Sequence, residues 1–132
     1  MTVDKVAEEW TVIRYFREQY ASFPKGKLNK SESPDFILQL NRKKQIGIEL
    51  TRFDDIGKYH QEGVSQNFTQ LLEKKENKLR LYKKHLLSEY WLIIFTESTD
   101  LEEILECAGR QTSSFDKVFL FELFSGEIEE FA

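Results

Sequence analysis

The stretch QIGIELTRF, residues 45–53, decides the fold, because it has the composition of a β-strand but carries an acid near its centre. Side chains alternate between the two faces of a strand. The apolar face is made of Ile46, Ile48 and Leu50. Glu49 falls on the other face, beside Gly47. Glu49 therefore either faces water on a half-buried strand or belongs to a site.

A second acid precedes this strand by a short interval. The run SESPDFILQL, residues 31–40, places Asp35 directly after a proline and at the start of another strand. The turn NRKK, residues 41–44, joins the two strands and predicts a hairpin. If the loop leaves an odd number of unpaired residues, Asp35 and Glu49 project on the same side. Taken alone, Asp35 is as well explained as the first residue of a strand.

Two carboxylates that converge repel each other, and a divalent cation or a lysine removes the repulsion. Oxygen ligands with no His or Cys nearby favour Mg²⁺ or Mn²⁺ over zinc. Gly47 has no side chain, so we expect space beside Glu49 for a ligand to approach the sheet.

The remaining pattern predicts one α/β domain over residues 1–132. Helical periodicity is found at 4–20, 61–87 and 100–107, and further strands are expected at 90–97 and 115–124. The expected order is α-β-β-α-β-α-β, a mixed central β-sheet flanked by helices. Residues 23–34, rich in Pro, Gly, Ser and Lys, are predicted to form a loop.

Composition and charge exclude several classes of protein. The single Cys107 allows neither a disulfide framework nor a cysteine metal site. The longest apolar run, WLIIF, is too short to span a bilayer, and the start lacks a signal-peptide pattern, so we expect a cytoplasmic protein without membrane contact. Net charge is −4, but residues 1–96 hold 17 basic against 13 acidic residues and residues 97–132 hold 2 against 10. This asymmetry suits a local anionic ligand, or is an ordinary solvated surface.

The first helix offers a third acid. At 100° per residue, Glu9 falls inside the apolar arc that also holds Val6, Trp10, Ile13 and Phe16. A buried acid needs a partner, because unpaired burial costs several kcal/mol. That partner is either an ion pair, with Arg17 or with a sheet lysine, or a metal ion.

These residues resemble the PD-(D/E)xK nuclease superfamily. The proline and aspartate at 34–35, followed by IGIELT at 46–51, are similar to small bacterial members with PDF and IGIE(V/L/I)T strands. The resemblance covers about residues 6–97 and implies a restriction-endonuclease-like core that hydrolyses phosphodiesters with Mg²⁺ or Mn²⁺. It implies metal ligation by Asp35 and Glu49. We expect the Leu50 carbonyl to add a third ligand, and Glu9 is a candidate to hold a second ion or a metal-bound water.

The chain departs from that family at its lysine, because Thr51 stands two residues after the acid. Some members carry the lysine on the following helix, and Lys75 lies within its apolar stripe, between the angles of Leu71 and Phe68. Lys75 is therefore the first candidate for the catalytic lysine, and Lys78, at the border of the stripe, is the second. The alternative is that a long lysine extends from the helix edge into solvent.

The implied partner is nucleic acid, with DNA preferred to RNA. Contacts to its phosphates are expected from Lys74, Lys78 and Arg52, although Arg52 points to the opposite face of the strand from Glu49. Two alternatives stay open: a nuclease-like domain that has lost catalysis and binds nucleic acid or protein, and a regulatory protein with a protein partner. A homodimer is equally compatible with the sequence.

Overall fold

We analysed a computed structural model of the 132-residue chain. The structure describes residues 2–32, 34–53, 61–82, 87–97, 101–108 and 113–131. Of residues 2–4, 61–67, 82 and 107–108 it describes the backbone only.

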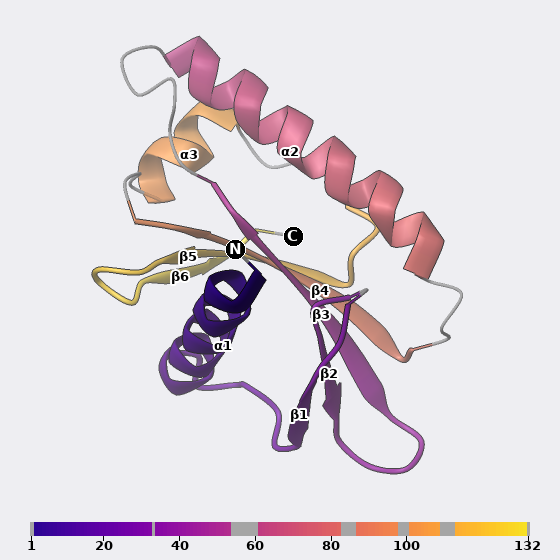
Figure 1. Cartoon of the computed structure of the whole chain (residues 1–132). Coiled ribbons are helices and arrows are strands. Elements are labelled where there is room, and N and C mark those ends of the chain that lie inside the picture. Colours follow the sequence, from indigo (N-terminus) through magenta and orange to yellow (C-terminus); the bar gives the residue numbers. More distant parts are fainter. Residues whose placement is uncertain are drawn as a thin grey trace.

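The centre of the molecule is a six-stranded mixed sheet with the order β1-β2-β3-β4-β5-β6 (Figure 1). Its strands are β1 (Lys27–Lys30), β2 (Phe36–Gln39), β3 (Gln45–Arg52), β4 (Glu89–Thr96), β5 (Lys117–Glu122) and β6 (Ile128–Glu130). β1, β2 and β3 pair antiparallel, β3, β4 and β5 pair parallel, and β6 returns antiparallel to β5. Each parallel pair is connected through a helix, as a parallel crossover requires.

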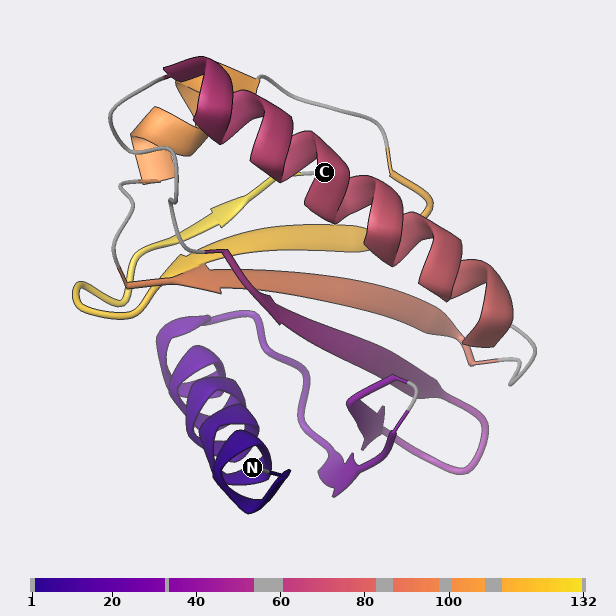
Figure 2. The same ribbon diagram turned by 45° about the horizontal axis from the view of Figure 1, so that its top comes forward.

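Three helices cover the two faces of the sheet. The helix α1 (Thr2–Gln19) lies against one face, and α2 (Gln61–Tyr82) and α3 (Leu101–Ala108) lie against the other, as Figures 1 and 2 both show. The sheet is therefore buried on both sides. This explains why β4 is apolar along nearly its whole length instead of alternating.

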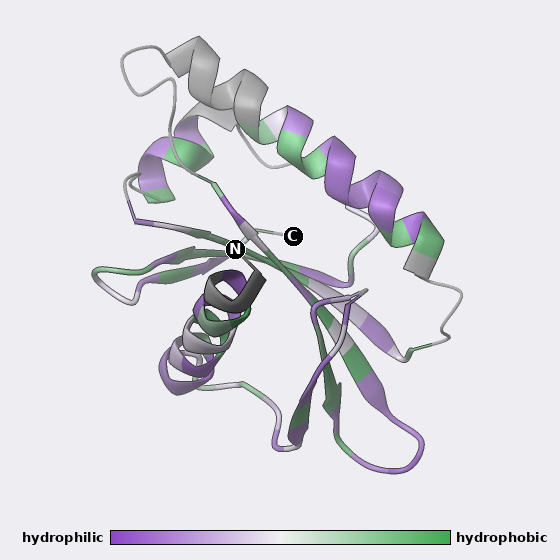
Figure 3. Cartoon of the chain, in the orientation of Figure 1, coloured by the Kyte–Doolittle hydropathy of each residue, from purple (hydrophilic) through white to green (hydrophobic). Residues whose placement is uncertain are grey.

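Two hydrophobic cores result, one on each face, and Figure 3 shows the apolar residues concentrated on the central strands. The core under α1 contains many aromatic rings, with Phe16 packed edge-on against Phe119 and Phe121. The core under α2 and α3 is built around Phe68, Leu72 and Leu79 of α2. Glu49 belongs to the face of β3 that this second core covers, because Ile46, Ile48 and Leu50 pack under α1.

The α/β class, the hairpin of β2 and β3, and the two further central strands are confirmed. The prediction of a loop over 23–34 was wrong, because Lys27–Lys30 pair with β2 as a strand. The predicted order also omits β6. Both short strands are held by pairing to a neighbour, and that tertiary contact overrides the loop-like composition.

Two helix predictions need amendment. Val6 is 40% exposed, whereas Val12, which the predicted stripe omits, is buried. The buried side of α1 is thus rotated away from Val6. For the second helix, α2 ends at Tyr82 within the described residues, and the predicted continuation through 83–86 lies outside them. Within the described part of the chain, no helix combines the length and apolarity needed to cross a membrane.

Candidate functional site

The register of the β2–β3 hairpin places the two predicted acids opposite each other. Phe36 pairs with Ile48 and Gln39 with Gln45, so the register continued by one residue brings Asp35 opposite Glu49. Five residues, 40–44, separate the last pair, which meets the odd-number condition for projection on the same side. The two carboxylates therefore share the face of the sheet that α2 covers.

Glu49 is the most buried charged side chain of this site, with 1% of its side chain exposed. Its Oε2 accepts hydrogen bonds from both Lys75 and Lys78, each with a Nζ to Oε2 distance of 2.9 Å. Its Oε1 is also buried and has no hydrogen-bond donor among the described residues. One oxygen of the carboxylate is therefore doubly paired, while the other retains an unused acceptor.

The two lysines reach Glu49 because of the way α2 packs. Leu72 and Leu79 are buried against the sheet, and Lys75 lies between them on the same side of the helix. Lys78 precedes Leu79 at the edge of that side. The structure thus brings both predicted lysines to the predicted acid, although Thr51 stands at the position where the family carries its lysine.

Asp35 ends the ladder between β2 and β3. The backbone N–H of Leu50 donates to Asp35 Oδ2 at 2.8 Å, so a side chain takes the place of the next ladder partner. The N–H and C=O of one strand residue point to the same neighbour. The Leu50 carbonyl is therefore directed to the same edge, where pairing with β2 has stopped.

The pKa of the Asp35 carboxyl is raised to about 7. Burial is the largest cause, and the negative charge of Glu49 is the second. The Leu50 hydrogen bond and the charge of Lys30 act in the opposite direction but are outweighed. A carboxylate in this position is short of positive charge.

The neighbouring acids also raise the pKa of Lys78. Burial acts to lower its pKa, but the hydrogen bond and charge of Glu49, together with the charges of Asp35 and Glu9, outweigh burial and raise it. Lys78 therefore keeps its positive charge at neutral pH.

The expected open space over Gly47 is not found. A Cβ at Gly47 would lie 2.7 Å from Leu87 Cδ1 and 2.8 Å from Pro34 Cγ. The glycine thus leaves space for Leu87 and for the ring of Pro34, which adjoins Asp35. The prediction that Gly47 makes room for a ligand was wrong, because these two side chains fill that room.

Glu9 approaches the site from α1 but is paired with a lysine. Its Oε1 lies 3.3 Å from Lys30 Nζ. The same ammonium donates to the carbonyls of Ser31 and Asp35, at 2.6 and 3.0 Å. The sheet-lysine alternative is therefore observed for Glu9. Lys30 was missed because it lies in the segment predicted as a loop. The alternation of LNK at 28–30 was the only signal that could have indicated a strand.

The predicted phosphate-binding residues differ in their surroundings. Lys74 is exposed on α2. Arg52 is held by ion pairs of 2.6 Å to both Glu8 and Glu97, and its guanidinium lies 5.0 Å from the ring centre of Phe95. Arg52 thus links α1 to β4 on the face away from Glu49, and Lys74 is the better placed of the two for an external ligand.

The donor set fits a divalent cation with few protein ligands. Within the described ranges, no three His, Cys, Asp or Glu side chains are grouped closely enough to hold a metal ion. Mg²⁺ is commonly held by one or two carboxylates and keeps several waters. Asp35, the unpaired Oε1 of Glu49 and the Leu50 carbonyl form such an oxygen set, and the lack of positive charge at Asp35 favours a cation there.

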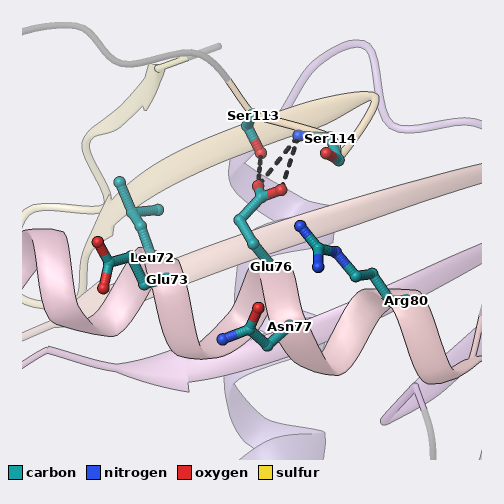
Figure 4. Close-up of a pocket in the computed structure, with 7 residues that line it drawn as sticks. All are labelled: Leu72, Glu73, Glu76, Asn77, Arg80, Ser113 and Ser114. Carbon is teal, nitrogen blue, oxygen red and sulfur yellow. Dashed lines mark hydrogen bonds between the residues drawn. The ribbon is translucent and has the colours of Figure 1, made fainter.

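A pocket lies on another flank of α2, away from these acids (Figure 4). Its lining residues are Leu72, Glu73, Glu76, Asn77, Arg80, Ser113 and Ser114. Glu76 accepts hydrogen bonds from the Ser113 hydroxyl and from the Ser114 backbone N–H. These contacts attach α2 to the segment before β5 and so help to fix the rotation of the helix that carries Lys75 and Lys78.

Comparisons of the chain with models of protein families, with curated proteins and with solved structures gave no match.

Proposed function

We propose that the protein is a divalent-metal-dependent nuclease of the PD-(D/E)xK type. The observation that carries the proposal is the placement of Asp35 opposite Glu49, with two helix lysines on Glu49. The paired acids and a lysine supplied by the next helix are the parts that the resemblance implies. The hydrogen-bond ladder between β2 and β3 ends beside them, at Leu50. Here they lie together although the residue after Leu50 is Thr51.

Each part has a role in phosphodiester hydrolysis. Asp35, Glu49 and the Leu50 carbonyl would hold Mg²⁺ or Mn²⁺, which when bound would supply Lewis acidity and lower the pKa of a water molecule. The helix lysines supply positive charge that offsets the negative charge developing on the phosphate as water adds to phosphorus and the bond to the leaving oxygen breaks. Contacts from Lys74 would add affinity without sequence selectivity.

The direct test measures cleavage of single- and double-stranded DNA and of RNA over a series of Mg²⁺ or Mn²⁺ concentrations. We expect metal-dependent cleavage, with DNA preferred, and a fall of at least about 100-fold for Asp35→Asn, comparable with the loss of a charge-stabilising group. Glu130→Gln is the matched control, since Glu130 is an acid exposed on β6. The control should leave cleavage unchanged.

Metal binding gives an independent readout. A ligand that binds only the folded state raises the melting temperature. We expect Mn²⁺ to raise it in the wild type and in Glu130→Gln, but not in Asp35→Asn. Cleavage that persists in EDTA, or the absence of any melting shift together with the absence of cleavage, would contradict the proposal.

A second candidate is a nuclease-like domain that binds nucleic acid or a protein without cleaving. Lys75 and Lys78 already neutralise Glu49, and Lys30 already neutralises Glu9, so the fold balances these charges with lysines. Oligonucleotide binding that needs no metal, combined with no cleavage of any substrate, would favour this candidate over the nuclease.

A further inference from the structure

The two lysines that share Glu49 differ in their access to solvent. The side chain of Lys75 is 13% exposed and that of Lys78 is 38% exposed, although both Nζ atoms lie 2.9 Å from the same Oε2. Lys75 lies between the buried Leu72 and Leu79, whereas Lys78 is at the margin of the packed side of α2. A ligand outside the protein can therefore reach Lys78 more readily than Lys75.

The charges around Glu49 are also unequal. Two ammonium groups share one carboxylate oxygen, so Glu49 neutralises only one of them. Asp35, opposite Glu49, and Glu9, which is paired with Lys30, are the other acids whose charges act on Lys78. The ammonium of Lys78 is partly exposed, and phosphate oxygens accept charge-assisted hydrogen bonds from such groups.

We infer that the two lysines have different functions: Lys75 is a positioning residue that holds the Glu49 carboxylate, and Lys78 transfers its hydrogen bond from Glu49 to a phosphate oxygen of the ligand. This division deepens the proposed nuclease function and rests on it for its catalytic meaning. The phosphate contact itself needs no metal ion, because it depends only on the ammonium of Lys78.

The geometry explains why Lys78 is able to leave Glu49. When Lys78 moves to a phosphate, Glu49 Oε2 keeps its hydrogen bond from Lys75, so no buried charge is left unpaired. If Lys75 moved instead, its buried stem would have to leave the space between Leu72 and Leu79. The buried lysine is thus suited to stay and the exposed one to exchange partners.

The experiment compares Lys75→Met and Lys78→Met in two measurements that use no metal. The first is the affinity for a fluorescent single-stranded oligonucleotide in EDTA, measured by anisotropy over a range of salt concentrations. Each phosphate contact contributes roughly 0.7 to the slope of log affinity against log salt for single strands. The second is the melting temperature of the free protein. Lys43→Met, at the far end of the hairpin, is the control for loss of one exposed positive charge.

We expect Lys78→Met to reduce the salt slope by roughly 0.7 and to leave the melting temperature within about 2 °C of the wild type. Lys78→Arg, which keeps the charge, should restore the slope. We expect Lys75→Met to lower the melting temperature by at least about 5 °C, since it weakens a buried ion pair. It should also reduce the slope, because Lys78 must then stay on Glu49, and adding Glu49→Gln to Lys75→Met should restore the slope by releasing Lys78. Lys43→Met should change neither quantity to this extent.

Three outcomes would overturn the inference: a slope that Glu49→Gln fails to restore in Lys75→Met, a slope unchanged by Lys78→Met, or no oligonucleotide binding in EDTA. If Lys75→Met fails to fold, Lys75→Arg provides the second comparison, and it should keep the wild-type slope. The proposed nuclease function fails separately. Binding that depends on Lys78 without cleavage in Mn²⁺ contradicts the proposed nuclease function but not the phosphate contact of Lys78. Cleavage combined with binding that does not depend on Lys78 contradicts the phosphate contact but not the nuclease function.

Discussion

Glu49 shows how a single buried acid organises its surroundings. The carboxylate is almost wholly buried, and two lysines are held by one of its oxygens. Ion pairs at exposed positions contribute little to stability, but a buried charge that loses its partner is strongly destabilising. The acid, and not either lysine, is the common element of this network.

We therefore predict that Glu49→Gln lowers the free energy of unfolding by about 3 kcal/mol, measured by urea denaturation. The substitution keeps the size of the side chain but leaves two ammonium groups beside a neutral amide. Glu130→Gln serves as the control, because its ion pair with Lys117 is long, at 3.6 Å, and largely exposed, so the expected loss is below about 1 kcal/mol. Equal losses in the two variants would show that the buried ion pairs of Glu49 contribute no more than an exposed pair.

Asp35 makes stability depend on pH. Its pKa is about 7 in the folded protein and 3.8 for an ordinary aspartate, so the folded state binds the proton more tightly than the unfolded chain. The resulting stabilisation is complete below pH 3.8 and is lost as pH rises through about 7. We predict that Asp35→Asn is more stable than the wild type at pH 8 by about 3 kcal/mol, relative to the difference between the two at pH 4.

Urea denaturation of both proteins at several pH values measures this difference directly. Mn²⁺ should reduce it at pH 8, because a bound cation favours the ionised carboxylate. A difference between wild type and Asp35→Asn that does not vary with pH would contradict the raised pKa of Asp35.

At the scale of elements, the β2–β3 hairpin and α2 together create the site. The hairpin register sets Asp35 against Glu49, and Pro34 occupies the space that Gly47 leaves. α2 supplies the lysines from the other side, with its orientation supported by Glu76. The site is therefore sensitive to small shifts between these elements.

We predict that Gly47→Ala lowers the free energy of unfolding by about 1 to 3 kcal/mol and weakens Mn²⁺ binding. The new Cβ would meet Leu87 and Pro34 below 3 Å, and the flexible leucine can move more easily than the proline ring that adjoins Asp35. Urea denaturation and Mn²⁺ titration by melting temperature measure the two effects.

Gly126→Ala is the matched control. Gly126 has a φ of 77°, so alanine is strained there, but the residue lies in the turn between β5 and β6. This variant should lose stability without losing Mn²⁺ affinity. If both alanine variants bind Mn²⁺ as the wild type does, Pro34 does not position Asp35.

Periodicity was sufficient to predict the central strands and the three helices, because these depend on patterns within one segment. The pairing of Asp35 with Glu49 was predicted only on the condition of an odd loop length, and the hairpin register meets that condition. Lys75 was predictable because a lysine within an apolar stripe requires a partner. The short strand β1 and the role of Lys30 were not, since they depend on pairing with β2 and on the approach of α1. The packing of Pro34 into the space above Gly47 depends on how the hairpin of β2 and β3 folds, which no local pattern specifies.

At the scale of the whole molecule, the sheet separates the charges. The β1–β3 half carries exposed lysines such as Lys25 and Lys27, whereas the β5–β6 half carries exposed acids such as Glu127 and Glu130. Asp35 and Glu49 lie in the basic half. The net charge of −4 thus understates the attraction of the site for an anionic ligand, because a ligand responds to the charges nearest to it.

This separation predicts that location, and not net charge, governs nucleic-acid binding. Reversing Lys74 to glutamate should weaken oligonucleotide binding in EDTA by at least about tenfold at low salt, because an exposed charge next to Lys75 changes sign. Reversing Glu130 to lysine alters net charge by the same amount in the opposite direction, but it should change the affinity by less than about threefold, since Glu130 lies on β6, three strands away from β3. Anisotropy titrations at 50 and 200 mM salt compare the two variants. Equal and opposite changes would mean that the ligand responds to total charge and not to the charges beside the site.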